Sequence, residues 1–154
     1  MADERSAGLT DSITINAGMD AILAVLGDFD SYPEWMSGVE AIEVLKRDRK
    51  KRGTEVRFTV DAVVRSISYV LKYSYPKANR IEMSLVEGDL EDCNSYYEFE
   101  DLSDGRTRVT YHYDVRYSLP RVLLNPVTRR LLKTVDKKVM NSALGDLKKR
   151  AESG

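Results

Sequence analysis

A change of hydrophobic period between the middle and the C-terminal end most constrains the fold of this chain. From Val39 to Val115, apolar residues recur at every second position in short runs, separated by turn signals such as Gly88-Asp89 and Asp104-Gly105. Strict alternation is typical of strands with one buried face. Tight turns between such strands favour an antiparallel meander, so one face of the predicted sheet needs a cover.

The C-terminal part of the chain predicts one long helix that provides this cover. Five apolar or small residues recur at every fourth position: Val127, Leu131, Val135, Val139 and Ala143. We expect a helix from Asn125 to about Ala151, which at roughly 1.5 Å per residue is long enough to cross the sheet diagonally. The five residues are expected to face the sheet.

The N-terminal residues complete the layout with a strand at 10–15 and two short helices. Four apolar residues have the spacing of an amphipathic helix: Met19, Ile22, Leu23 and Leu26. We expect Asn16 to cap this helix and Gly27 to end it. Residues 31–36 predict a second short helix with Pro33 in its first turn. The sequence thus predicts a single α+β domain over residues 1–154.

Composition is that of an ordinary globular protein, with 42% hydrophobic and 32% charged residues. The longest apolar run, Ala21–Leu26, is too short to span a membrane, and the acidic N-terminus does not resemble a signal peptide. We therefore expect a cytoplasmic protein, with at most peripheral membrane contact. One cysteine and one histidine make a disulfide, a zinc site and a Cys/His nucleophile implausible, so no metal or cofactor is expected.

Basic residues are concentrated in two places. Residues 119–152 hold nine Lys or Arg against three Asp or Glu, whereas the remaining positions hold 15 against 22. This segment is interpreted either as a solvated helix face or as a surface for an acidic partner or an anionic membrane. The cluster Lys46–Arg52 is interpreted either as a solvated turn or as a weak contact with anionic headgroups. It lacks interleaved aromatic residues, and the pI is near 5.9, so no nucleic-acid partner is expected.

Strand parity places several tyrosines on the face that turns towards the helix: Tyr69, Tyr73, Tyr97, Tyr111 and Tyr113. Ser95 and Cys93 share that face, with the thiol interpreted as a small buried apolar group. Apolar walls with a few polar groups are typical of a small-molecule site. The alternative is that these tyrosines are core residues whose hydroxyls reach the rim.

Few other groups on the strands can do chemistry. His112 lies between Tyr111 and Tyr113 and is therefore predicted on the outer face of the sheet. Arg65 shares parity with Tyr69, so it could point inward near a strand end. The alternative for Arg65 is that its long side chain extends to solvent.

Four motifs resemble those of the START-like, or SRPBCC, superfamily. They are Asp28-Phe29-Asp30-x-Tyr32-Pro33-Glu34-Trp35-Met36-x-Gly38-Val39, Val86-Glu87-Gly88-Asp89, Tyr97-x-Phe99 and Gly105-x-Thr107-x-Val109-Thr110-Tyr111. The resemblance extends over residues 10–150 and is nearest to the polyketide cyclase/dehydrase and coenzyme-Q-binding-protein-like branch. It implies a helix-grip fold, in which a curved seven-stranded antiparallel sheet wraps around a long C-terminal helix and encloses an apolar cavity. It also implies two short helices between the first two strands, with Trp35 at the mouth of the cavity.

The resemblance implies binding of a hydrophobic small molecule, such as a lipid, a polyketide or an isoprenoid quinone. The ligand-binding candidates are Trp35, Phe58, Val60, Tyr69, Leu71, Tyr73, Met83, Cys93, Ser95, Tyr97, Tyr111, Tyr113, Leu131, Val135 and Val139. The alternative is a polyketide aromatase/cyclase or dehydratase that acts on a poly-β-ketone in the same cavity. In polyketide cyclases an inward arginine helps to polarise a carbonyl, which makes Arg65, with Tyr69 or Tyr97, the weak catalytic candidates. Fold alone does not decide between binding and catalysis, and we expect a monomer or a weak homodimer.

Overall fold

The structure is a computed structural model that describes residues 8–61, 65–117 and 125–153. Its strands are β1 (Leu9–Ile15), β2 (Val39–Arg47), β3 (Gly53–Asp61), β4 (Ser66–Lys77), β5 (Arg80–Gly88), β6 (Leu90–Asp101), β7 (Thr107–Tyr113) and β8 (Val115–Tyr117). Its helices are α1 (Met19–Gly27), the 3-10 helix η1 (Phe29–Ser31), α2 (Tyr32–Trp35) and α3 (Pro126–Ser153). The α+β layout predicted from the sequence is confirmed.

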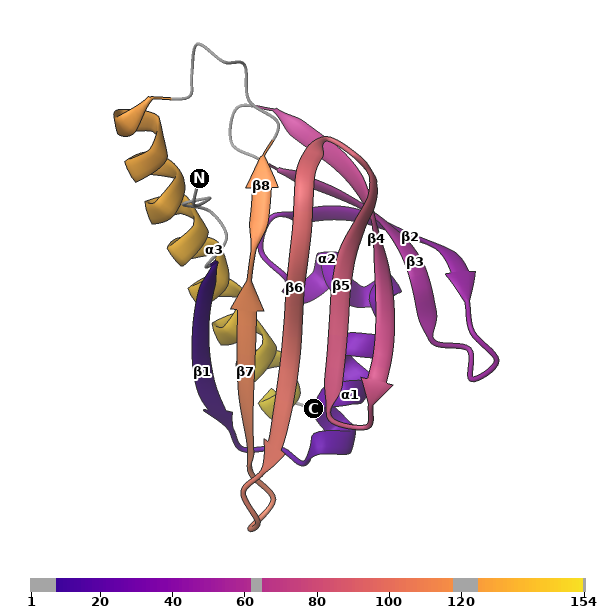
Figure 1. Cartoon of the computed structure of the whole chain (residues 1–154). Coiled ribbons are helices and arrows are strands. Elements are labelled where there is room, and N and C mark those ends of the chain that lie inside the picture. The colour runs from indigo at the N-terminus through magenta and orange to yellow at the C-terminus, as the bar shows by residue number, and fades with distance from the viewer. Residues whose placement is uncertain (1–7, 62–64, 118–124, 154) are drawn as a thin grey trace.

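The strands form one antiparallel sheet in the order β1-β7-β6-β5-β4-β3-β2, and the short β8 pairs with β6. Hairpins join neighbours from β2 to β7, as expected for a meander, whereas β1 closes the sheet by pairing with β7. α1, α2 and the C-terminal part of α3 lie behind the strands in Figure 1, on one side of the sheet. This arrangement is the expected helix-grip fold.

The core lies between the sheet and the helices. Ile15, Ile22, Val56 and Val109 are fully buried, and Leu147 of α3 is nearly so. Burial of such aliphatic side chains is the main driving force of folding, at about 25 cal/mol per Å² of apolar surface. The sheet and α3 are therefore held together mainly through the C-terminal half of the helix.

Two local predictions were wrong. Asn16 does not cap α1, because Gly18 occupies the N-cap position and the Asn16 N–H instead donates to Glu152 Oε2 at 2.8 Å. The Tyr75-Pro76 pair was expected to end its strand, because proline lacks an N–H, but β4 continues through it to Lys77. The ladder between β4 and β5 is irregular between Ser74 and Lys77, which accommodates a proline that has no N–H to donate.

The predicted sheet-facing stripe of the long helix was also wrong. Val127, Leu131, Val135 and Val139 are exposed to solvent, and the buried residues of α3 are Met140, Leu144 and Leu147. Four residues turn a helix by about 400°, so each step of the predicted stripe drifts by about 40°. Five such residues therefore spread over about 160° of the helix surface and do not all point to the sheet.

Figure 1 shows that α3 extends past the end of β1. Its C-terminal half is fastened to that strand, since Lys148 Nζ donates to the Thr14 carbonyl at 3.0 Å. On the other side of the helix, the Ser37 N–H donates to Asp146 Oδ2 at 2.9 Å. No helix of the described ranges is both long and apolar enough to cross a membrane.

Candidate functional site

The candidate site is the face of the sheet that turns towards the helices. Because side chains alternate along a strand, odd-numbered residues of β4, β6 and β7 all point to this face. The registers then place these residues in rows, with Tyr97 opposite Tyr111 and Phe58 opposite Tyr69. The Tyr97 and Tyr111 rings stack with centroids 4.3 Å apart, and the Phe58 and Tyr69 rings stack at 5.6 Å.

Several phenol groups converge in the middle of this face. Burial raises the pKa of Tyr73 well above its ordinary value. Four neighbouring phenols raise it further: Tyr32, Tyr97, Tyr111 and Tyr69. Such mutual influence requires the phenol groups to lie close together. At neutral pH each keeps its proton and can donate a hydrogen bond to a carbonyl oxygen.

Some of these hydroxyls already have partners. Tyr32 donates to the Leu26 carbonyl at 2.5 Å, and the hydroxyls of the stacked Tyr97 and Tyr111 influence each other's pKa. Among the described residues, no hydrogen-bond partner is found for the hydroxyls of Tyr69 and Tyr73. Because neither hydroxyl is bonded to a described residue, these two are the ones available to a bound molecule.

A carboxyl group lies at one end of the phenol cluster. Asp136 of α3 lies near the hydroxyls of Tyr117 and Tyr113, which favour its charged form and whose oxygens are 2.6 Å apart. Burial raises the pKa of the Asp136 carboxyl to about 6. Its Oδ1 is the one buried side-chain N or O atom that lacks a hydrogen-bond partner within the described ranges.

An unpartnered buried oxygen is costly, so Asp136 is suited to accept a hydrogen bond from a ligand hydroxyl. With a pKa of about 6, the same group can gain or lose a proton near neutral pH.

Ser95 and Cys93 lie on the same face, but their contacts indicate a structural role. Ser95 Oγ accepts the Asp114 N–H at 3.1 Å, which holds the junction between β7 and β8. Burial raises the pKa of the Cys93 thiol to about 11, so it stays protonated and is a poor nucleophile. Within the described part of the chain, no three His, Cys, Asp or Glu side chains are arranged to hold a metal ion.

Trp35 lies where α2 meets the end of α3. Its ring packs edge-on against Tyr32, with centroids 5.2 Å apart. It also lines a surface hollow of about 340 Å³, together with Glu34, Asp146, Lys149, Arg150 and Ser153. Arg150 Nη2 lies 3.5 Å from Glu34 Oε1, so polar contacts bridge α2 and α3 around Trp35.

The structure brings most of the predicted site residues together on this face. The buried ones are Phe58, Leu71, Tyr73, Met83, Cys93, Ser95, Tyr97, Tyr111 and Tyr113, and those half-buried are Trp35, Val60 and Tyr69. Two groups of candidates lie elsewhere. Leu131, Val135 and Val139 are exposed on α3. Arg65 is exposed immediately before β4, which agrees with the alternative that its side chain extends to solvent.

His112 belongs to the outer face, as predicted. Its ring stacks on Tyr96, with centroids 5.0 Å apart, and its Nδ1 lies 2.7 Å from Thr10 Oγ1. The histidine therefore contributes to pairing between β1 and β7 and does not face the phenol cluster.

Sequence reasoning missed Asp136, Tyr117 and Tyr32. A signal for Asp136 was present, because Asp136, Met140, Leu144 and Leu147 follow helical spacing and share one face. A carboxylate on an otherwise apolar face is uncommon unless it is paired or functional. That pattern was hidden by the regular Val and Leu residues on the neighbouring face.

Comparison with known proteins agrees with this architecture. Residues 6–152 match the family described as polyketide cyclase/dehydrase and lipid transport, whereas no functionally curated protein matches the sequence. A START superfamily protein from Mycobacterium smegmatis is 20% identical, with a TM-score of 0.76 over 92% of this chain and 97% of that one.

Two other solved structures have a similar fold. The Zhui aromatase/cyclase from Streptomyces sp. R1128 is 20% identical, with a TM-score of 0.77 over 94% of this chain and 92% of that one. The major latex-like protein 151 of Panax ginseng is 12% identical, with a TM-score of 0.66 over 93% of this chain and 95% of that one. At these identities the neighbours establish the fold, and the match over residues 6–152 establishes that the chain belongs to the polyketide cyclase/dehydrase and lipid transport family.

Proposed function

We propose that this protein holds an apolar small molecule between the sheet and α3, and that the molecule carries an oxygen function. The observation that supports this proposal is the set of converging phenols, two of which, Tyr69 and Tyr73, have no partner among the described residues. The apolar body of the ligand packs against residues such as Phe58, Leu71 and Met83. Its oxygen accepts a hydrogen bond from a phenol or donates one to Asp136.

The first experiment asks whether the protein carries a ligand. Purified full-length protein is examined by native mass spectrometry, then extracted with organic solvent to identify any bound apolar compound. In parallel, binding of 2-naphthol is measured by fluorescence titration. We expect a bound apolar compound or saturable probe binding. Absence of both would contradict the proposal.

The second experiment asks whether the phenol hydroxyls contact the ligand. Tyr69→Phe and Tyr73→Phe remove one hydroxyl each and keep the ring. Loss of one hydrogen bond is expected to weaken 2-naphthol binding by about 3- to 10-fold. Tyr96→Phe is the matched control, because Tyr96 stacks on His112 at the outer face. Equal probe affinity in all three variants would show that these hydroxyls do not orient the ligand.

Asp136 supports a second candidate function, catalysis on a poly-β-ketone. A carboxylate with a pKa near 6 can remove a proton from the carbon between two carbonyl groups. A neighbouring protonated phenol can then donate a hydrogen bond to the enolate oxygen. Arg65, the arginine expected to assist, is exposed and has no part in this scheme.

The catalytic function makes a prediction that can be tested separately from ligand binding. Turnover of a poly-β-ketone by the wild type is expected to rise with pH through about 6, as the Asp136 carboxyl loses its proton. Asp136→Asn is expected to abolish turnover but to keep binding of naphthalene, which has no polar group. If the wild type binds apolar probes but converts no poly-β-ketone, the proposed ligand binding is supported and the catalytic role of Asp136 is contradicted.

A further inference from the structure

The N-terminal half of α3 carries a solvent-exposed apolar stripe that the ligand site does not use. Val127, Leu131, Val135 and Val139 are 67%, 61%, 43% and 41% exposed. Contiguous exposed apolar side chains commonly mark a contact surface. We call these four residues the α3 stripe.

Helix geometry shows which side of α3 the stripe occupies. Val139 precedes Asp146 by seven residues, which corresponds to about 700° of rotation, so the two side chains lie within about 20° of each other. Asp146 accepts the Ser37 N–H at 2.9 Å, so this side of α3 is covered by the segment after α2 in the C-terminal half. In the N-terminal half the same side is exposed.

Five cations lie within residues 126–139, and the structure describes the side chains of four of them. Arg130, Lys133, Lys137 and Lys138 are exposed, and none forms an ion pair with a described residue. Asp136 is the single acidic residue of this segment, and its carboxyl group is directed to the Tyr117 and Tyr113 hydroxyls. This half-helix thus combines exposed aliphatic side chains with unneutralised positive charge, as interfacial membrane helices do.

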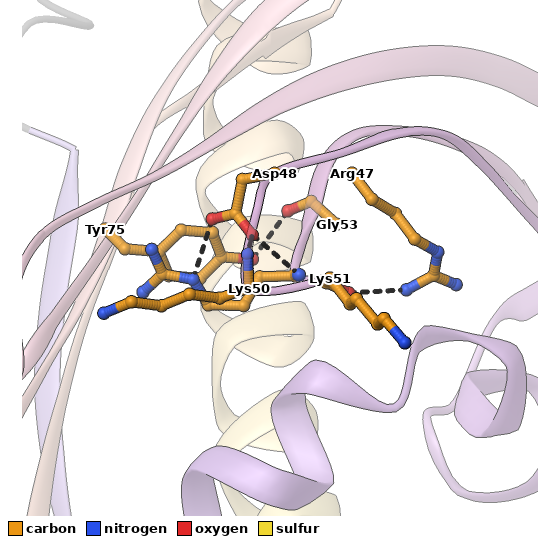
Figure 2. Close-up of polar contacts among 7 residues, drawn as sticks. Arg47, Asp48, Lys50, Lys51, Gly53 and Tyr75 are labelled. Carbon is orange, nitrogen blue, oxygen red and sulfur yellow. Dashed lines mark hydrogen bonds and ion pairs between the residues drawn. The ribbon is translucent and has the colours of Figure 1, made fainter.

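Basic residues of the hairpin between β2 and β3 instead have polar partners within or next to the hairpin, as Figure 2 shows for Arg47. Arg52 Nε lies 2.8 Å from Asp48 Oδ2, and Lys46 Nζ lies 3.1 Å from Glu55 Oε2. Arg47 donates to the Lys51 carbonyl at 2.9 Å. The hairpin residues 46–53 include no apolar side chain that could insert into lipid.

The hairpin and the start of α3 also lie at opposite sides of the molecule in Figure 1. The two basic regions therefore do not form one continuous surface. Of the two, only the α3 stripe has both charge and apolar side chains.

We propose that residues 126–139 of α3 dock on an anionic phospholipid surface, with the α3 stripe inserted among the lipids and the four cations at the phosphates. Charge complementarity favours this occupant, and the stripe contains only Val and Leu. Protein interfaces instead draw most of their affinity from Trp, Tyr and Arg. Docking on lipid would place the helix that covers the ligand site beside a reservoir of apolar molecules.

The proposal is tested by flotation of the full-length protein with vesicles of phosphatidylcholine, with or without 30% phosphatidylglycerol. We expect binding to the anionic vesicles that weakens with added salt. Replacing Lys133, Lys137 and Lys138 by Gln is expected to lower the partition coefficient about a hundredfold. Replacing Arg49, Lys50 and Lys51 by Gln removes the same charge from the hairpin and is expected to change it less than threefold.

The apolar contribution is tested separately. Leu131→Ser with Val135→Ser is expected to lower partitioning about tenfold, whereas Val86→Ser, an exposed valine on β5, is the matched control. Binding of 2-naphthol in the same variants shows whether the ligand site is intact, so failure of docking is distinguishable from failure of the ligand site.

Four results would overturn the proposal. They are no vesicle binding by the wild type, equal loss in the hairpin and helix variants, a stripe variant that partitions like the wild type, and a dimer by light scattering that the stripe variant converts to monomer. The third result, combined with equally tight binding of poly-L-glutamate, would assign the surface to an acidic protein partner. The fourth would assign the stripe to a second copy of the chain.

Discussion

Gly88 shows how a single backbone position shapes the candidate site. Its φ is +117°, a backbone angle that residues other than glycine rarely adopt. A Cβ at this position would lie 2.4 Å from the Tyr69 Cα and 2.6 Å from the Ser68 carbonyl oxygen. The close approach of β5 to β4 at Tyr69, one of the two unpartnered phenols, therefore requires glycine.

Gly88→Ala is expected to reduce the free energy of unfolding by about 2–5 kcal/mol, from backbone strain and steric overlap together. Gly105→Ala is the control, because Gly105 also has positive φ but has open space around it, so a loss of about 1 kcal/mol is expected. Urea denaturation of both variants measures the difference. Equal losses would show that contact with Tyr69 is not important.

The Asp136 carboxyl predicts a specific pH dependence of stability. Its pKa is raised from 3.8 to about 6 by burial, so between these pH values the folded chain keeps a proton that the unfolded chain has lost. The contribution of Asp136 to the free energy of unfolding therefore falls as pH rises from about 4 to about 6 and is constant above that range.

Asp136→Asn is expected to remove this decrease in the free energy of unfolding between about pH 4 and about pH 6. The free energy of unfolding of both proteins is measured by urea denaturation at several pH values, and the difference between them isolates Asp136 from the other titrating groups. A difference that is independent of pH between 4 and 7 would show that the pKa of this carboxyl is not raised.

At the scale of elements, α3 consists of two halves with different roles. The C-terminal half contains the buried Met140, Leu144 and Leu147 and the polar contacts to β1 and to Ser37. The N-terminal half contributes Asp136 to the site and presents the α3 stripe to solvent.

Alanine substitutions in the two halves are expected to differ strongly. Leu147→Ala removes a 1%-exposed side chain and is expected to cost about 2–5 kcal/mol of unfolding free energy. Leu131→Ala removes a 61%-exposed one and is expected to change stability by no more than about 0.5 kcal/mol. Thermal or urea denaturation checks both, and similar costs would mean that the N-terminal half is packed as well.

For the whole molecule, the proposed ligand site couples the sheet to the N-terminal half of α3 through Asp136. A ligand held between them is expected to slow amide hydrogen exchange in residues 126–139 more than in residues 140–153, because the latter are already fastened by burial. The measurement compares the protein with and without saturating 2-naphthol. Protection confined to β2 and β3 would place the ligand away from α3.

Much of this architecture was predictable because strands obey a simple rule. With a period of two, parity alone assigned Tyr73, Tyr97, Tyr111 and Tyr113 to the buried face. The motifs that resemble the START-like superfamily supplied the order of elements, and family membership agrees with it.

The face of the long helix was less predictable from sequence. Two candidate stripes existed in α3, one at a regular spacing of four and one at Asp136, Met140, Leu144 and Leu147. Hydropathy favours the first, but the second is the one that packs. Helical periodicity tolerates a broad arc of apolar positions, so a single sequence does not choose among neighbouring faces.

The sequence by itself therefore determined the meander, the long C-terminal helix and the inward tyrosines, because local periodicity is sufficient for each of them. Only the tertiary structure decided which phenols pair with each other, which remain unpartnered, and that Asp136 joins Tyr113 and Tyr117. It also decided that Arg65 and the α3 stripe face solvent. These outcomes depend on contacts between elements far apart in the chain, and no local pattern encodes such distances.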